Sequence, residues 1–267
     1  MRIFPGKDAE TMTVQDFYQL IDRLAPFDGQ EEYDNSGFLV GSGSKEVSSV
    51  LLALDVTDSV IDDAVRQGAQ LIITHHPLMF SPVRSLTDAD YESRLIMRLI
   101  REEISLIAAH TNLDRAPGGM NDVLAERCGL TEVSGDGFFR CGFLPSPMSA
   151  GEYALWLQEK LGDAVRLMGP ADLLIRKTGL CSGGGSDEWP RARDTGCDAF
   201  ICGEIKHHHA LAMADSGIIG LECGHFATEE PGIRALASAL QSAANQLQCN
   251  VRFYVSDKPA YVVSRQP

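Results

Sequence analysis

Two kinds of segment alternate along the first half of the chain. Short, continuously apolar runs such as "AQLIITHH" (69–76) are typical of strands buried on both faces of a sheet. Segments with apolar residues at helical spacing, such as 91–103, separate these runs. The alternation predicts a largely parallel sheet with flanking helices. The predicted strands are 48–56, 69–76 and 104–110, and the predicted helices are 11–26, 58–68, 91–103 and 118–129.

The pattern starts again at "GFFRCGFL" (137–144), so we expect a second α/β half. No long linker or low-complexity segment separates the halves, which indicates that they pack tightly or interlock. We place them at 1–130 and 131–267, each a mostly parallel sheet with flanking helices. The predicted helices of the second half are 149–162, 186–196, 206–217 and 231–247, and its strands lie within 164–169, 173–185, 198–204, 218–223 and 250–256.

Composition excludes several classes of protein. The net charge is −14 over 267 residues, and no basic run marks a surface for duplex nucleic acid, although a small phosphorylated substrate stays compatible with a metal ion. The seven cysteines are scattered without a C-x-x-C pair, so no disulfide framework is expected. No apolar stretch approaches the roughly 20 residues that cross a bilayer. We expect a soluble, cytoplasmic protein without a membrane partner.

Candidate ligands follow the predicted strands. In open α/β sheets, ligands bind beyond the carboxyl ends of the strands. Three strand ends carry imidazoles, and two of these are followed by a carboxylate four residues later, one turn away if the segment is helical. The residues are His75 and His76 after the second strand, His110 and Asp114 after the third, and His225 and Glu229 after "IIGLEC".

His75 and His76 are adjacent, and adjacent strand residues normally point to opposite faces. Pro77 has no N–H and a fixed φ, so it ends the ladder and lets both imidazoles reach one site. A single buried histidine is more often a satisfied polar group than a ligand. Four histidines and two carboxylates at equivalent strand ends favour a metal site instead.

The candidate ligands are more than one ion needs. A carboxylate can bridge two cations, and a pair of metal ions can activate water for hydrolysis. We expect Glu229 to be the bridge, with His110 either a further ligand or a residue behind the ligands. Imidazole and carboxylate donors without thiolate favour zinc, iron or manganese. The predicted ligands of two divalent ions are His75, His76, Asp114, His225 and Glu229.

Other motifs carry weaker signals. In "GEIKHHHA" (203–210), His208, with Lys206 and Glu204 beside it, is a candidate for proton transfer or for contact with a substrate phosphate. A solvated helix start explains that run equally well. "CSGGGS" (181–186) either offers N–H groups to an anion or makes a tight turn. In "EYDNSGFLVG", Asp34 and Asn35 either orient a ligand or belong to a turn before a strand.

Five motifs together resemble those of the GTP cyclohydrolase I type 2 family, the NIF-three-like dinuclear metal-centre proteins: "DNSGFLVG", "LIITHHPLMF", "AAHTNLD", "CGEIKHHHAL" and "GHFATE". The resemblance spans nearly the whole chain. It implies two similar, interlinked halves, two divalent metals per subunit and a ring-shaped homohexamer built as a trimer of dimers. It also implies that the segment from about 217 to 267 completes the metal site of the first half.

The resemblance maps the family's ligands onto the same five residues, with Glu229 bridging. The segment at 202–208 usually reads T-G-D-I-K-Y-H in the family, so His208 matches a recurring histidine, whereas His207 and His209 do not. Glu204 replaces an aspartate.

Three functions remain open. The first is a dinuclear metal-dependent hydrolase of a nucleotide-like or phosphorylated small molecule, with Glu229 and His208 as catalytic residues. The second is a metal carrier or assembly factor that uses the same ligands without turnover. The third is an α/β scaffold whose histidines fill polar niches.

Overall fold

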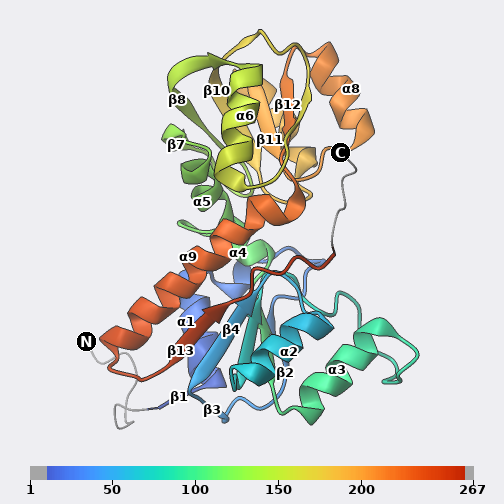
Figure 1. Ribbon diagram of the computed structural model, residues 1–267, viewed down its shortest axis with the longest axis vertical. Helices are drawn as coiled ribbons and strands as arrows, with labels where there is room; N and C mark the ends of the chain where they lie inside the picture. The colour runs from blue at the N-terminus through green and yellow to red at the C-terminus, as the bar shows by residue number, and fades with distance from the viewer. Residues whose placement is uncertain (1–10, 262–267) are drawn as a thin grey trace. The chain divides into compact units, whose positions relative to one another are not determined.

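The computed structural model describes residues 11–261, which form two compact units (Figure 1). Unit 1 contains the described residues up to Leu113 and those from Ile233 onward, and unit 2 is Asp114–Gly232. These bounds differ from the expected halves 1–130 and 131–267. The C-terminal segment returns to unit 1 because its last strand pairs with a strand of the first sheet.

Unit 1 is built on a five-stranded sheet in the order β13-β4-β5-β6-β2. Four strands are parallel, and β2 pairs antiparallel with β6 at one edge. The strands β4, β5 and β6 are buried along their whole length, as the continuously apolar runs predicted. The strands are β2 (Gly37–Val40), β4 (Ser49–Ala53), β5 (Leu71–Thr74), β6 (Ser105–Ala108) and β13 (Arg252–Val255), and a separate ladder joins β1 (Met12–Thr13) to β3 (Glu46–Val47).

The helices of unit 1 begin and end at the signals in the sequence. Thr13 and Asp16 form a reciprocal capping box at the start of α1, with the Thr13 N–H 2.8 Å from Asp16 Oδ2. Gly68, with φ of +58°, follows the end of α2. The elements are α1 (Val14–Leu24), the 3₁₀ turn η1 (Phe27–Gly29), α2 (Asp58–Arg66) and α3 (Tyr91–Arg101).

Unit 2 contains a six-stranded sheet in the order β7-β8-β10-β11-β12-β9. Only β10, β11 and β12 are parallel to one another, so this sheet is more mixed than we expected. β7 and β8 are joined by a short turn, which requires antiparallel pairing. The strands are β7 (Thr131–Ser134), β8 (Arg140–Ser149), β9 (Arg166–Met168), β10 (Leu174–Cys181), β11 (Ala199–Cys202) and β12 (Ile219–Glu222).

The helices of unit 2 pack on two cores: α5 and α6 contribute to one, and α7 and α8 to the other. Tyr153 lies in the first core, is fully buried and donates its hydroxyl to the Cys128 carbonyl at 2.8 Å. A second capping box, Ser149 with Glu152, starts α6. The elements are α4 (Thr111–Arg115), within which the division between units falls, α5 (Met120–Arg127), α6 (Ala150–Leu161), η2 (Ser186–Glu188), α7 (Trp189–Asp194) and α8 (His207–Asp215). The prediction of two α/β halves is confirmed.

Helix α9 (His225–Gln246) begins six residues earlier than the predicted helix 231–247. A proline often marks a first helical turn, but Pro231 lies inside this helix. It has no N–H to donate to the carbonyl four residues earlier, a loss that a helix interior tolerates at a cost. The early start places His225 and Glu229 on successive turns.

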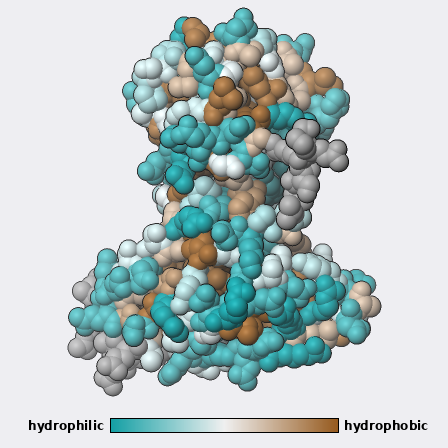
Figure 2. All heavy atoms as spheres, viewed as in Figure 1, coloured by the Kyte–Doolittle hydropathy of each residue, from teal (hydrophilic) through white to brown (hydrophobic). Residues whose placement is uncertain are grey.

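The face of the protein seen in Figure 2 is mostly hydrophilic, with apolar residues in separate patches. Among the described residues, no helix combines the length and the apolar character that crossing a bilayer requires.

Candidate metal centre

His75 and His76 lie just beyond β5, which ends at Thr74. Their backbone N–H groups still donate to the neighbouring segment, to the Ala53 carbonyl at 3.2 Å and the Leu54 carbonyl at 2.9 Å. The backbone then bends before Pro77. The strand therefore ends two residues before the predicted end at 76, although its backbone hydrogen bonds continue as far as His76. The two side chains are thereby released from the strict alternation of a strand.

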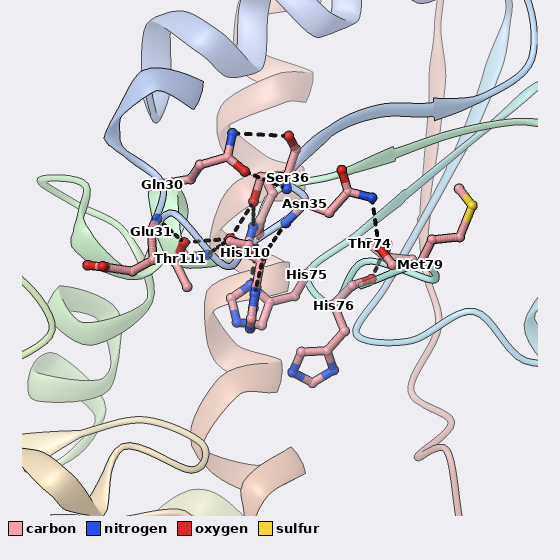
Figure 3. A network of polar contacts seen from close by, with 12 residues as sticks. Gln30, Glu31, Asn35, Ser36, Thr74, His75, His76, Met79, His110 and Thr111 are labelled. Carbon is pink, nitrogen blue, oxygen red and sulfur yellow. Dashed lines mark hydrogen bonds and ion pairs between the residues drawn. The ribbon is translucent and has the colours of Figure 1, made fainter. Parts of the chain in front are cut away.

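The imidazoles of His75, His76 and His110 form one cluster within unit 1. One ring nitrogen of each histidine lies within 4.8 Å of a ring nitrogen of both others. The ring centroids of His75 and His76 are 5.0 Å apart, and those of His76 and His110 are 5.5 Å apart. Figure 3 shows the three rings gathered beside the segment that carries Asn35 and Ser36.

Each ring is held through its Nδ1 atom by an oxygen that can only accept a hydrogen bond. The acceptors are the Ala109 carbonyl for His75 at 2.9 Å, Asp55 Oδ1 for His76 at 2.8 Å, and Asp34 Oδ1 for His110 at 2.9 Å. Nδ1 therefore carries the proton, and Nε2 keeps the lone pair that binds a metal. Metal-binding histidines are usually held in this way, so the cluster fits a divalent metal ion.

Asp34 is the centre of the hydrogen-bond network behind His110. Its side chain is fully buried and also accepts from the Thr111 N–H at 3.0 Å and the Ser36 hydroxyl at 2.9 Å. Burial works to raise the pKa of Asp34, but the hydrogen bonds from His110 and Thr111 outweigh it and hold the pKa well below its ordinary value. Asn35 donates to the Met79 carbonyl at 2.7 Å. Both residues thus support the segments that carry the imidazoles.

In unit 2, His225 and Glu229 form a second donor pair. His225 Nε2 lies 3.1 Å from Glu229 Oε2, and His225 Nδ1 lies 3.4 Å from Glu204 Oε1. The Glu229 side chain is 5% exposed, whereas that of Glu204 is 58% exposed. The four-residue spacing therefore places an imidazole beside a carboxylate, as predicted for a helical turn.

The glycine-rich loop after β10 packs against this pair. A Cβ atom on Gly183 would lie 2.0 Å from Glu229 Oε1. The N–H groups of Ser182 and Gly183 donate to Asn121 Oδ1 at 2.8 Å and Thr228 Oγ1 at 3.1 Å. The loop thus uses these N–H groups within the protein, and its glycine allows close approach to Glu229.

Asp114, the remaining predicted ligand, is buried in α4 with 8% of its surface exposed. Asn121 donates to its backbone carbonyl at 3.0 Å and also holds Ser182. Asn121 therefore links Asp114 to the glycine-rich loop within unit 2.

The histidine run at the start of α8 lies in a polar cluster on unit 2. Lys206 is ion-paired with Asp187, and this hydrogen bond lowers the pKa of Asp187. His209 Nδ1 lies 3.0 Å from the Ser186 hydroxyl, so His209 is the anchored member of the run. His208 is exposed and contacts His209, with ring centroids 4.2 Å apart.

Sequence reasoning missed two residues, Asp55 and Gly183. Asp55 follows β4 and accepts a hydrogen bond from His76. The expectation that functional residues lie beyond the carboxyl ends of strands, which identified the histidines, applies to Asp55 as well. Gly183 lies in the glycine run, which we interpreted as an anion site or a tight turn and not as a segment that packs on Glu229.

The two sheets and the histidine cluster at the carboxyl ends of parallel strands define an α/β protein with a candidate divalent-metal centre. The chain belongs to the Duf34/NIF3 (NGG1p interacting factor 3) family, whose model matches residues 12–260. The resemblance drawn from the motifs is thereby confirmed.

Individual relatives and solved structures also match over most of the chain. A Clostridium perfringens protein named "GTP cyclohydrolase 1 type 2 homolog" is 33% identical over 255 residues, covering 92% of this chain and 96% of the relative. A Staphylococcus aureus hypothetical protein matches with a TM-score of 0.88 at 28% identity, covering 95% of this chain and all of the other. Reduced HcgD from Methanocaldococcus jannaschii matches with a TM-score of 0.79 at 26% identity, covering 94% of this chain and 100% of the other.

Proposed function

We propose that this protein is a divalent-metal-dependent hydrolase of a nucleotide-like or phosphorylated small molecule. The observation that carries the proposal is the cluster of His75, His76 and His110, in which each Nδ1 is fixed by an acceptor. A merely structural buried histidine needs partners for both ring nitrogens within the protein and does not need imidazole neighbours. The Nε2 lone pairs of three neighbouring histidines are suited to binding a cation.

The proposed centre holds two divalent ions, with zinc, iron or manganese suited to its imidazole and carboxylate donors. Its proposed ligands are His75, His76, Asp114, His225 and Glu229, with Glu229 as the bridge, and His110 is a further ligand from the unit 1 cluster. When bound, such ions lower the pKa of water and polarise a phosphoryl or carbonyl oxygen.

The protein's own residues have separate roles in this proposal. Asp34 and Asp55 keep the imidazoles in one tautomer and orientation. His208 and Lys206 are exposed on unit 2, where they are the candidates to contact a substrate phosphate or transfer a proton. The name of the Clostridium perfringens relative supports a nucleotide as substrate.

The test combines metal analysis with an activity screen. Purified protein is analysed for bound metals and assayed with GTP and a simple phosphomonoester in the presence of Zn²⁺, Mn²⁺ or Fe²⁺. Glu229→Gln should lower both metal content and turnover, whereas His207→Ala, an exposed histidine at the start of α8, should change neither. Unchanged turnover in Glu229→Gln would remove this mechanism.

Bound, exchangeable metal without hydrolysis of any substrate would identify a metal carrier or assembly factor instead. Protein purified without metal, with no uptake on titration, would identify a scaffold. We also propose the homohexamer that the family resemblance implies, and its mass is measurable by light scattering.

A further inference from the structure

Unit 1 contains a cavity of about 1110 Å³ between α3, the loop that precedes it and the end of β2. Its volume lies just above the usual range for ligand sites, roughly 300–1,000 Å³. Leu39 and Met79 line it at the rim of the core, and Val83, Leu86 and Ile100 form part of its wall. Most of the wall is therefore apolar.

Three of these wall residues are exposed although they are large and apolar. Val83, Leu86 and Ile100 are 38%, 47% and 55% exposed. A ligand with an apolar body would remove their surface from water, which is favourable in proportion to the area covered. An apolar patch that surrounds a cavity is typical of a binding site rather than of ordinary surface.

The cavity is separate from the candidate metal centre. None of the histidines or carboxylates of that centre lines it. One hydrogen bond joins the surroundings of the two: Met79, a wall residue, accepts through its carbonyl from Asn35 (Figure 3). Binding in the cavity therefore does not depend on the proposed hydrolase activity.

The charged groups of the wall are two cations, Lys45 and Arg84, and one carboxylate, Glu103, in a protein whose net charge is −14. Lys45 is held by Glu103, the acidic residue of the wall, with Nζ 3.7 Å from Oε2. Arg84 has no ion pair or hydrogen bond to any other residue that the structure describes. Its guanidinium is thus available to an anionic group, and its planar fork suits a carboxylate or phosphate.

A buried polar group in the wall adds to this. Ser105 is 1% exposed, and its hydroxyl has no hydrogen-bond partner among the described residues. It packs against Gly41, on which a Cβ would lie 2.2 Å from Ser105 Oγ. A buried hydroxyl without a protein partner is uncommon in native proteins, and an ordered water usually satisfies such a group.

From the apolar wall, the volume and the cation, we propose that this cavity binds a single-chain amphiphile with an anionic head group, a carboxylate or a phosphate. The chain occupies the space between α3 and β2, and the head group pairs with Arg84. Electrostatic complementarity selects the sign of the head group, and the apolar wall supplies most of the affinity.

The test is displacement of a fluorescent fatty acid, 11-(dansylamino)undecanoate, from the whole protein. The competitors are myristate, dodecyl phosphate and dodecyltrimethylammonium, each below its micelle concentration. Both anions should displace the probe at concentrations at least about tenfold lower than the cation, because the cation cannot form the charged hydrogen bond with Arg84. The ratio of myristate to dodecyl phosphate identifies the preferred head group.

Two variants locate the site. Arg84→Ala should weaken both anions roughly tenfold, whereas Arg101→Ala, on exposed α3 surface outside the cavity, should leave them unchanged. Ile100→Asp should weaken the binding of all three competitors, and circular dichroism checks that this variant folds. Equal displacement by anions and cation, or unchanged affinity in Arg84→Ala, would overturn the proposal. A further result would also overturn it: the parent does not bind the probe, and Ile100→Asp changes the oligomeric mass. The face around Ile100 would then be an interface between copies of the chain.

Discussion

Asp55 Oδ1 lies 2.8 Å from His76 Nδ1, although 21 residues separate the two in the chain. The relationship follows from the parallel pairing of β4 with β5, in which Ala53 is opposite Thr74. Residues two positions beyond each of these meet at the same edge of the sheet. A carboxylate after one strand thus controls the tautomer of an imidazole after the next.

Asp55→Ala should weaken metal binding about 10- to 100-fold, because His76 loses the acceptor that fixes its ring. Competition titration of Zn²⁺ or Mn²⁺ against a chelator measures the change. Asp62→Ala is the matched control, since this exposed carboxylate pairs with Arg98 away from the imidazoles. Equal metal affinity in the two variants would contradict a role for Asp55 in holding His76.

Gly183→Ala should destabilise the protein by about 1–3 kcal/mol through overpacking. Its Cβ would meet Glu229 Oε1 at 2.0 Å, and its φ of +55° adds strain for any residue with a side chain. Gly184→Ala is the control, because nothing lies within 4 Å of a Cβ there and its φ is not in the left-handed region. Urea denaturation of metal-free protein compares the two, and similar losses would argue against close packing at Glu229.

Asp34→Asn should lower stability at neutral pH and lose its effect in acid. The pKa of Asp34 is lowered in the folded protein, so its carboxylate stabilises the fold above the unfolded pKa of about 4. That contribution disappears as pH falls below this value toward the folded pKa. The expected difference in unfolding free energy is at least about 1.4 kcal/mol at pH 7, since one pKa unit has that value.

Denaturation of the parent and of Asp34→Asn, both kept in chelator, measures this difference from pH 7 down to about pH 2. If the difference in unfolding free energy between parent and variant stays constant or increases as the pH falls, the pKa of Asp34 is not lowered by folding. Asp28→Asn, in the 3₁₀ turn η1, is the control for loss of a carboxylate in this part of the chain.

Thr13→Ala should cost about 1 kcal/mol of stability, because the capping box at the start of α1 loses its hydroxyl acceptor. Thr11→Ala, at an exposed position before β1, should have little effect. Thermal melting compares the two variants with the parent. Equal melting temperatures in all three would show that the cap contributes nothing.

The sequence was sufficient for the elements whose signals are local. Continuous apolar runs identified β4, β5 and β6, and the Thr13 cap identified the start of α1. The strand-end rule also brought His75, His76 and His110 to one place, because parallel strands share a carboxyl edge.

Features that depend on distant pairing were harder to predict. The antiparallel β9 and β8 of unit 2 read as ordinary strands in the sequence, because residue pattern does not record direction. Pro231 suggested a helix start, whereas α9 begins at His225. The packing of Gly183 on Glu229 joins residues 46 positions apart, and no local pattern indicates it.

The pairing of β13 with β4 has a consequence for synthesis of the protein. Unit 2 is one continuous stretch, Asp114–Gly232, so all of its strands have been synthesised before Arg252 is added. Unit 1 lacks this edge strand until Arg252–Val255 has been synthesised, and meanwhile β4 presents unpaired backbone groups. The sheet of unit 2 can therefore be completed before the sheet of unit 1.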